Sequence, residues 1–99
     1  MAAFRLTTAA VGDLEDIWFY TRDRWSIEQA DRYYSLIISE IDFIASNPLA
    51  GRSMEPIKTG YRSAKVKSHL IFYREDADGT VLIVRILHQS MDCRSRLGS

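Results

Sequence analysis

Two basic side chains stand at the end of an apolar run in the stretch VRILHQSMD, residues 84–92. A histidine can transfer a proton near neutral pH, and an arginine can stabilise negative charge that develops in a transition state. Arg85 and His88 are therefore candidates for acid–base chemistry on an anionic substrate. The same pair can instead serve recognition, in which cations at the margin of a sheet contact another macromolecule.

Strand parity separates the two side chains. In a regular strand Arg85 shares a face with Val81, whereas His88 lies on the opposite face. They converge only if the chain leaves strand geometry near Leu87, and the polar residues that follow allow such a departure. Parity thus weakens a catalytic interpretation of the pair without removing it.

Several ionisable residues also have structural interpretations. An arginine within an apolar run needs a partner because burial of an unpaired cation is costly, and Glu55, Glu75 or a bound protein could pair with Arg85. His69 has no metal-ligand companion at a useful spacing, so we expect a turn or core histidine. Cys93 is the only cysteine and is expected to be a partly buried apolar side chain.

Hydrophobic periodicity indicates the elements that must position these residues. An alternating run at 4–7 predicts an edge strand, and apolar residues repeating at three and four predict helices from Thr7 or Thr8 to about Trp25 and from Ser26 to Asn47. Ser26-Ile-Glu-Gln29 has the form of a capping box. After a loop at 48–60, three β-rich runs follow at 61–66, 69–74 and 80–87, and the last is expected to be central and covered on both faces.

Each helix carries one apolar stripe. The stripe of the first helix comprises Val11, Leu14, Trp18 and Trp25, with Thr21 filling the missing position. That of the second comprises Ala30, Tyr33, Tyr34, Ile37, Ile38, Ile41, Ile44 and Ala45. Four large side chains lie off these stripes: Phe19, Tyr20, Leu36 and Phe43. Either each helix packs on both its neighbour and the sheet, or these side chains form an exposed surface of the kind that marks a protein interface.

The elements predict a single α+β domain spanning residues 1–99. Its order is strand, helix, helix, strand, strand, strand, with a short tail, and the two-helix hairpin packs on a small antiparallel sheet that the first strand joins at an edge. A chain of 99 residues with 46% hydrophobic content can bury one core.

Composition excludes several function classes. The 13 basic and 13 acidic residues balance, which argues against a domain held on nucleic acid mainly by phosphate neutralisation, and no sequence-specific DNA binding is expected. No signal peptide and no stretch of roughly 18 apolar residues is present, so we expect a cytoplasmic protein without membrane contact. No phosphate-binding glycine loop, nucleophile–base pair or metal-ligand spacing occurs, and neither cofactor nor metal is expected.

Taken together and in this order, five segments resemble the ParE branch of the RelE/ParE toxin superfamily. They are Leu14-Glu-Asp-Ile-Trp18, Asn47-Pro48 followed by Gly51, Gly60-Tyr-Arg62, His69-Leu-Ile-Phe-Tyr-Arg74 and Val84-Arg-Ile-Leu-His-Gln89. The resemblance covers nearly the whole chain. It implies the toxin of a bacterial type II toxin–antitoxin pair that stabilises a plasmid or chromosome, with a ParD-like antitoxin as neutralising partner and DNA gyrase as target.

The two branches of the superfamily imply different roles for the basic residues. The RelE-like branch cleaves messenger RNA on the ribosome, and Lys65, Lys67, Arg74, Arg85 and His88 are the candidates for that chemistry. The ParE branch acts by engaging gyrase and needs no catalytic residue, so we interpret the chain as a protein-binding inhibitor. A non-toxic member that only binds its antitoxin is the third possibility.

Under the ParE interpretation, residues on or after the sheet are candidates for contact with the target or another partner. These residues are Arg62, Lys65, Arg74, Arg85, His88, Arg94 and Arg96. The tail is included because the end of the chain is thought to matter for toxicity in ParE-like toxins. The candidates for antitoxin binding are Phe19, Tyr20, Leu36 and Phe43.

Overall fold

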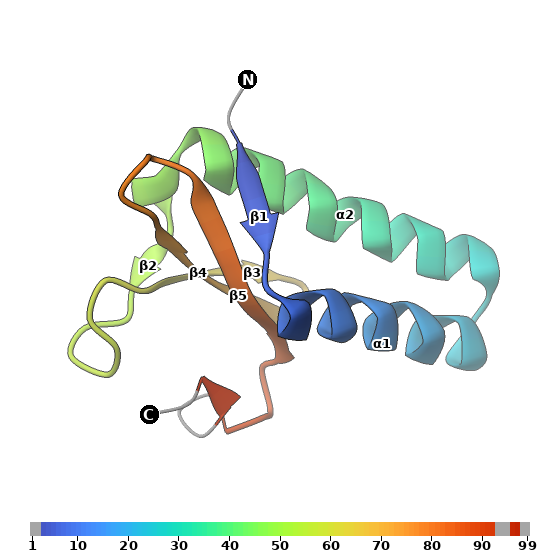
Figure 1. Ribbon diagram of the computed structural model, residues 1–99. Helices are drawn as coiled ribbons and strands as arrows, with labels where there is room; N and C mark the ends of the chain where they lie inside the picture. The colour runs from blue at the N-terminus through green and yellow to red at the C-terminus, as the bar shows by residue number, and fades with distance from the viewer. Residues whose placement is uncertain (1–2, 93–95, 98–99) are drawn as a thin grey trace.

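The computed structural model describes residues 3–92, 96 and 97. Its elements are β1 (Phe4–Leu6), α1 (Thr8–Arg24), α2 (Ile27–Ser46), the 3₁₀ turn η1 (Pro48–Ala50), β2 (Arg52–Ser53), β3 (Arg62–Val66), β4 (His69–Glu75) and β5 (Val81–His88). The strands form one five-stranded sheet in the order β1-β5-β4-β3-β2, and α1 and α2 form a hairpin against it (Figure 1). The predicted α+β class and helix hairpin are confirmed. Within the described residues, neither helix is long and apolar enough to span a membrane.

Both helices begin where the sequence predicts. The Thr7 hydroxyl accepts a hydrogen bond from the Ala10 N–H at 3.0 Å, and the Ser26 hydroxyl accepts one from the Gln29 N–H at 3.1 Å. Each bond satisfies a backbone donor that the first turn leaves free. The reciprocal half of the predicted capping box is wrong, because the Gln29 side chain accepts from Arg32 at 3.1 Å instead.

The sheet contains the predicted meander and one strand that was missed. β3, β4 and β5 pair antiparallel in sequence order, and β1 pairs parallel with β5, with Phe4 opposite Val81. The predicted edge position of the first strand is therefore confirmed. The segment expected to be only a loop, 48–60, contains η1 and the two-residue strand β2, which is too short to show a periodicity.

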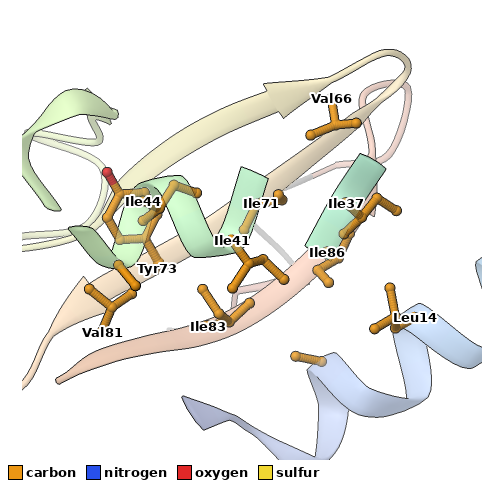
Figure 2. Packing of buried hydrophobic residues seen from close by; sticks show 12 residues of the cluster. Leu14, Ile37, Ile41, Ile44, Val66, Ile71, Tyr73, Val81, Ile83 and Ile86 are labelled. Atoms are coloured by element: carbon orange, nitrogen blue, oxygen red, sulfur yellow. The ribbon is translucent and has the colours of Figure 1, made fainter. Parts of the chain in front are cut away.

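The core lies between α2 and one face of the sheet. Ile37, Ile41 and Ile44 of α2 are buried against a layer of strand side chains (Figure 2), namely Val66, Ile71, Tyr73, Val81, Ile83 and Ile86. Burial of one such aliphatic side chain stabilises the fold by about 1.5–3 kcal/mol. The predicted apolar stripe of α2 is thus largely confirmed, although Tyr34 remains 43% exposed.

The predicted stripe of α1 is wrong at two positions. Val11 is 45% and Trp25 is 75% exposed, whereas Ala10, Leu14 and Thr21 are buried. The buried Thr21 hydroxyl is satisfied by donating a hydrogen bond to the Ile17 carbonyl at 2.7 Å. The stripe is therefore confirmed at Leu14 and Thr21 and wrong at Val11 and Trp25.

A β-bulge in β5 reverses the face of the sheet to which the residues after Val84 point. Phe72 pairs with Arg85 and Tyr73 pairs with Ile83, which leaves Val84 without a partner. Ile86 consequently joins Ile83 in the core cluster, although regular alternation puts them on opposite faces. The expected departure from strand geometry thus occurs at Val84, before Arg85, and not near Leu87.

Candidate functional site

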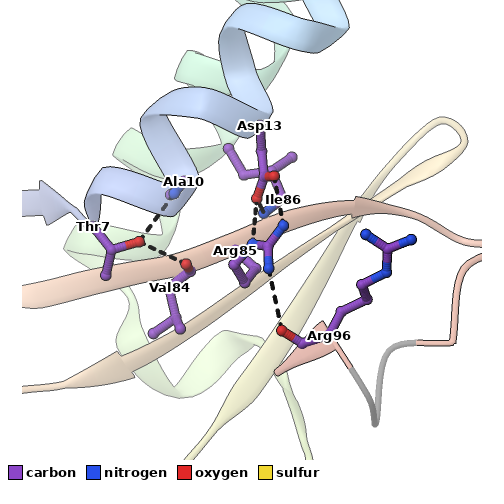
Figure 3. Close-up of polar contacts among 7 residues, drawn as sticks. All are labelled: Thr7, Ala10, Asp13, Val84, Arg85, Ile86 and Arg96. Carbon is purple, nitrogen blue, oxygen red and sulfur yellow. Dashed lines mark hydrogen bonds and ion pairs between the residues drawn. The ribbon is translucent and has the colours of Figure 1, made fainter. Parts of the chain in front are cut away.

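Arg85 is bound within the chain by Asp13 of α1. The guanidinium donates from Nε to Oδ2 at 2.7 Å and from Nη2 to Oδ1 at 2.8 Å, so the contact is bidentate (Figure 3). These hydrogen bonds to Asp13, opposed by partial burial, hold the pKa of Arg85 above its usual value. The expected partners Glu55 and Glu75 were wrong; a partner 72 residues away leaves no local signal in the sequence.

Asp13 and Thr7, the capping residue of α1, also form hydrogen bonds with the backbone of β5 beyond the end of β1. Past the end of β1, the Thr7 N–H donates to the Ile83 carbonyl at 3.0 Å and the Thr7 hydroxyl to the Val84 carbonyl at 2.7 Å. Asp13 Oδ2 accepts from the Ile86 N–H at 3.0 Å. Thr7 and Asp13 therefore take the place of a neighbouring strand and stabilise the bulge.

His88 faces the helix-covered side and lies opposite His69 in the β4–β5 ladder. The two ring centroids are 5.3 Å apart with the rings nearly perpendicular. Nδ1 of His88 accepts from the Ser90 N–H at 3.1 Å, so the neutral ring carries its proton on Nε2. The neutral ring can therefore donate a hydrogen bond from Nε2, while its Nδ1 lone pair is already engaged by Ser90.

His69 lies beside His88, a contact that the spacing of the two residues in the sequence does not predict. Its Nδ1 lies 2.6 Å from Tyr33 Oη, which in turn donates to the Val66 carbonyl at 3.1 Å. Burial, with a smaller contribution from the neighbouring charge of His88, lowers the pKa of His69 below its usual value. Among the described residues, no group of three or more His, Cys, Asp or Glu side chains could hold a metal ion.

Arg85 and His88 meet at the rim of one hollow of about 160 Å³. Asp13, Asp16 and His69 also border it. Arg96, which is exposed, lies at the same rim, and its carbonyl accepts from Arg85 Nη1 at 3.2 Å. The two residues of the opening motif therefore share a rim, but Arg85 is already neutralised by Asp13.

The other basic candidates are dispersed. Arg74 forms an ion pair with Asp76 at the far end of β4. Arg62 donates to the Gly51 carbonyl at 2.8 Å, which ties β3 to the turn before β2. Lys65 is exposed on β3, and Lys67 is exposed in the β3–β4 turn. Arg94, like Cys93, lies outside the described residues.

The face of the sheet opposite the helices is mainly apolar. Phe72 and Leu87 point to it by strand alternation, and they are only 1% and 2% exposed. Leu70 shares this face and is partly buried. Phe72 and Leu87 are thus covered by other parts of the chain, and Arg85, which pairs with Phe72 in the ladder, lies on the same face.

The four side chains off the helix stripes are exposed. Phe19, Tyr20, Leu36 and Phe43 are between 43% and 60% exposed, so the interpretation that each helix buries them by packing on both neighbour and sheet is wrong. Two of them border different hollows. Phe19 borders a groove of about 500 Å³ that β1, α1 and α2 enclose, whereas Phe43 borders a separate hollow between α2 and β3.

The groove beside Phe19 is lined almost entirely by apolar and aromatic side chains. Its lining comprises Phe4, Leu6, Val11, Leu14, Glu15, Trp18, Phe19, Tyr34 and Ile38, and Glu15 is the one charged residue. Trp18 packs edge-on against Phe19, and the Arg22 guanidinium lies 4.9 Å from the Phe19 ring centroid. An apolar groove with a charged margin suits the apolar side of another protein segment.

Comparison with known proteins places the whole fold in one family. The model of the ParE toxin of type II toxin–antitoxin systems, parDE, matches residues 4–93. Toxin ParE1 of Mycobacterium tuberculosis is 44% identical over 89 residues, covering 90% of this chain and 91% of the relative. Toxin ParE1 of Caulobacter vibrioides is 42% identical over 98 residues, covering 99% of this chain and 100% of the relative.

Solved structures agree with the sequence relatives. A chromosomal ParDE toxin–antitoxin system from P. aeruginosa superimposes with a TM-score of 0.77 at 22% identity, covering 89% of this chain and 96% of the other. The RelBE2 toxin–antitoxin complex from Mycobacterium tuberculosis gives a TM-score of 0.64 at 25% identity, covering 88% and 96%. The family model and the curated relatives show that this chain belongs to the ParE toxin family of type II toxin–antitoxin systems.

Proposed function

We propose that this toxin inhibits DNA gyrase by binding to it and that a ParD-like antitoxin neutralises the toxin. The observation that supports binding over RNA cleavage is the dispersal of the candidate nuclease residues. Arg74 and Arg85 are each engaged by an aspartate, and His88 points to the helix-covered side.

RNA cleavage needs these groups to converge. A base or its equivalent activates the 2′-hydroxyl, cations stabilise the charged phosphorane, and an acid protonates the leaving oxygen, all around one phosphate. Here a phosphate would have to displace the Asp13 carboxylate from a bidentate contact with Arg85. Binding to a protein requires no such convergence, because separate cations around an apolar surface each contribute to recognition.

Gyrase inhibition is tested by adding the purified toxin to DNA gyrase and relaxed plasmid. We expect supercoiling to be inhibited in proportion to toxin concentration. Replacement of both Arg94 and Arg96 by Ala should weaken inhibition without unfolding the domain, whereas Arg32→Ala, which removes an exposed cation from α2, serves as the control. Full supercoiling at toxin excess would contradict the proposal.

The alternatives are separated by parallel assays. If the toxin is a ribosome-dependent ribonuclease, coupled translation fails and messenger RNA fragments appear while supercoiling continues. If it is a non-toxic family member, expression without the antitoxin leaves growth unchanged. Only a supercoiling defect that precedes any translation defect agrees with the gyrase proposal.

The antitoxin is proposed to lay an amphipathic segment in the groove between β1, α1 and α2. Relatives of known structure are toxin–antitoxin complexes, and this groove offers the apolar surface that such a segment needs. Truncation of one apolar anchor typically costs about 2 kcal/mol of binding free energy, so Phe19→Ser should weaken antitoxin binding in calorimetry. Leu49→Ser is the matched control, because Leu49 is exposed outside this groove. Equal affinities for Phe19→Ser and the parent protein would contradict this location.

A further inference from the structure

The outer edge of β3 is open along half of its length. β2 pairs only with Arg62 and Ser63, and the chain before β2 turns away into η1. The Met54 N–H donates to the Tyr61 carbonyl at 2.9 Å, so every second residue of β3 presents its backbone groups to the β2 side. Continuing this alternation through Ser63 brings the N–H and C=O of Lys65 to the open edge.

A hollow of about 250 Å³ lies beside this open edge. Its floor is formed by Ser63, Ala64 and Lys65, and one wall is formed by Phe43 and Ile44 of α2 together with Glu40, Ala50, Gly51 and Arg52. The next strand of the sheet would occupy this place. Phe43 is 52% exposed there, so an added strand would cover an apolar ring as well as extend the ladder.

The other side of the edge carries free cations. Arg52 lies opposite Ser63, and Lys65 is two residues further along β3, so both side chains point to the face away from the helices. Within the described part of the chain, neither forms an ion pair. Both also border a second hollow of about 450 Å³, where Glu55 is the one acid and its carboxylate is engaged by the Gly60 N–H at 2.8 Å.

We propose that the β3 edge binds an extended segment of a partner protein in which apolar and acidic residues alternate. Backbone hydrogen bonds to Lys65 supply the register, as in other cases of strand addition. Because side chains of a strand alternate between faces, apolar residues of the segment meet the exposed ring of Phe43, and its carboxylates meet Arg52 and Lys65. This surface is distinct from the groove beside Phe19 and goes beyond the proposed inhibition of gyrase.

A second copy of this chain does not suit the edge. Antiparallel pairing of two β3 edges would bring Lys65 and Arg52 of one copy against the same cations of the other, and like charges on neighbouring strands repel. The lone lysine on an open edge therefore disfavours self-association and leaves the edge for an acidic segment.

The test uses the full chain and short fluorescein-labelled peptides in fluorescence anisotropy. One peptide alternates Val and Glu, a second alternates Val and Lys, and a third is the Val–Glu peptide with backbone N-methylation on the pairing edge. We expect saturable binding of the first peptide alone. Amide hydrogen exchange at Lys65 should slow in its presence, because strand addition protects that N–H.

Charge-reversing variants locate the site. The double variant Arg52→Glu with Lys65→Glu should lower the affinity for the Val–Glu peptide by about tenfold and favour the Val–Lys peptide instead. Arg32→Glu with Arg24→Glu is the control with the same change in net charge, placed on the helices. Circular dichroism of each variant establishes that the fold is retained.

Several outcomes would overturn the proposal. These are failure of the Val–Glu peptide to saturate, equal binding of the N-methylated peptide, unchanged affinity in the Arg52→Glu, Lys65→Glu variant, or a concentration-dependent dimer that this variant abolishes. None of these outcomes bears on supercoiling, so the gyrase proposal is judged separately.

Discussion

Asp13 and Arg85 join α1 to β5 through two parallel hydrogen bonds of 2.7 and 2.8 Å. Their side chains are 13% and 22% exposed, so the pair is partly screened from water. Asp13 also receives the Ile86 N–H at the point where β1 no longer covers the edge of β5. One carboxylate therefore neutralises a cation and satisfies the strand edge at the same time.

Removal of this carboxylate charge should destabilise the fold. Asp13→Asn keeps the shape but weakens the charge-assisted bonds to Arg85, and bonds of this kind contribute about 2 kcal/mol each to stability. We expect the free energy of unfolding, measured in urea by far-ultraviolet circular dichroism, to fall by about that amount. Asp16→Asn is the matched control, since Asp16 is exposed at the same hollow. Equal stability of the two variants would show that the Asp13–Arg85 pair contributes nothing.

The features of the fold that sequence predicts are those with a local cause. Thr7 and Ser26 begin helices because each hydroxyl reaches a backbone N–H three residues later. The bulge at Val84 has no such cause. It is held by Thr7 and Asp13, which lie on another element, so alternation within β5 alone placed Arg85 on the wrong face.

In the candidate site, too, the sequence predicts local features but not those that depend on distant segments. The basic residues of the sheet can be found in the sequence, but their partners cannot, because pairing of Arg85 with Asp13 and of His69 with His88 depends on how distant segments pack. Periodicity also failed to decide whether Phe19 is buried. A side chain off the stripe of a helix is covered only if a neighbouring element reaches it, which is a property of the assembled layers.

Among the glycines that the structure describes, Gly51 is the one at which an added Cβ would clash with another part of the chain. Its N–H donates to the Tyr73 hydroxyl at 2.9 Å, and that hydroxyl donates to the Pro48 carbonyl at 2.8 Å. A Cβ at position 51 would lie 2.8 Å from two ring carbons of the fully buried Tyr73 and closer still to its oxygen. Overpacking of this kind costs about 3 kcal/mol, so Gly51→Ala should unfold at markedly lower urea concentration.

Gly12 provides the control for that substitution. It lies inside α1, and a Cβ there would have no neighbour within 4 Å. Alanine in a helix interior is favoured over glycine by about 1 kcal/mol, so Gly12→Ala should raise the free energy of unfolding. Destabilisation by both substitutions would indicate that the close approach of Gly51 to Tyr73 is not the cause.

The lowered pKa of His69 predicts a loss of stability in acid. The imidazole is neutral in the fold, whereas the unfolded chain takes up a proton near the ordinary value of 6.5. Because the unfolded state binds more protons, stability falls as the pH drops from above 6.5 through the lower pKa of the folded state. Urea unfolding from about pH 8 to about pH 5 should show a shallower decline for His69→Gln than for the parent protein. Parallel declines would assign the acid sensitivity to other groups.

Lys67 occupies a backbone conformation that favours glycine. Its φ is +53° in the turn between β3 and β4, where a Cβ crowds the neighbouring carbonyl. Lys67→Gly should therefore raise the free energy of unfolding by about 1 kcal/mol.

The same variant also tests function, because Lys67 is one of the nuclease candidates and is exposed. A toxin that inhibits gyrase through other surfaces keeps its supercoiling inhibition in Lys67→Gly, measured at equal folded concentration. Loss of toxicity together with loss of messenger RNA cleavage would instead support the ribonuclease alternative.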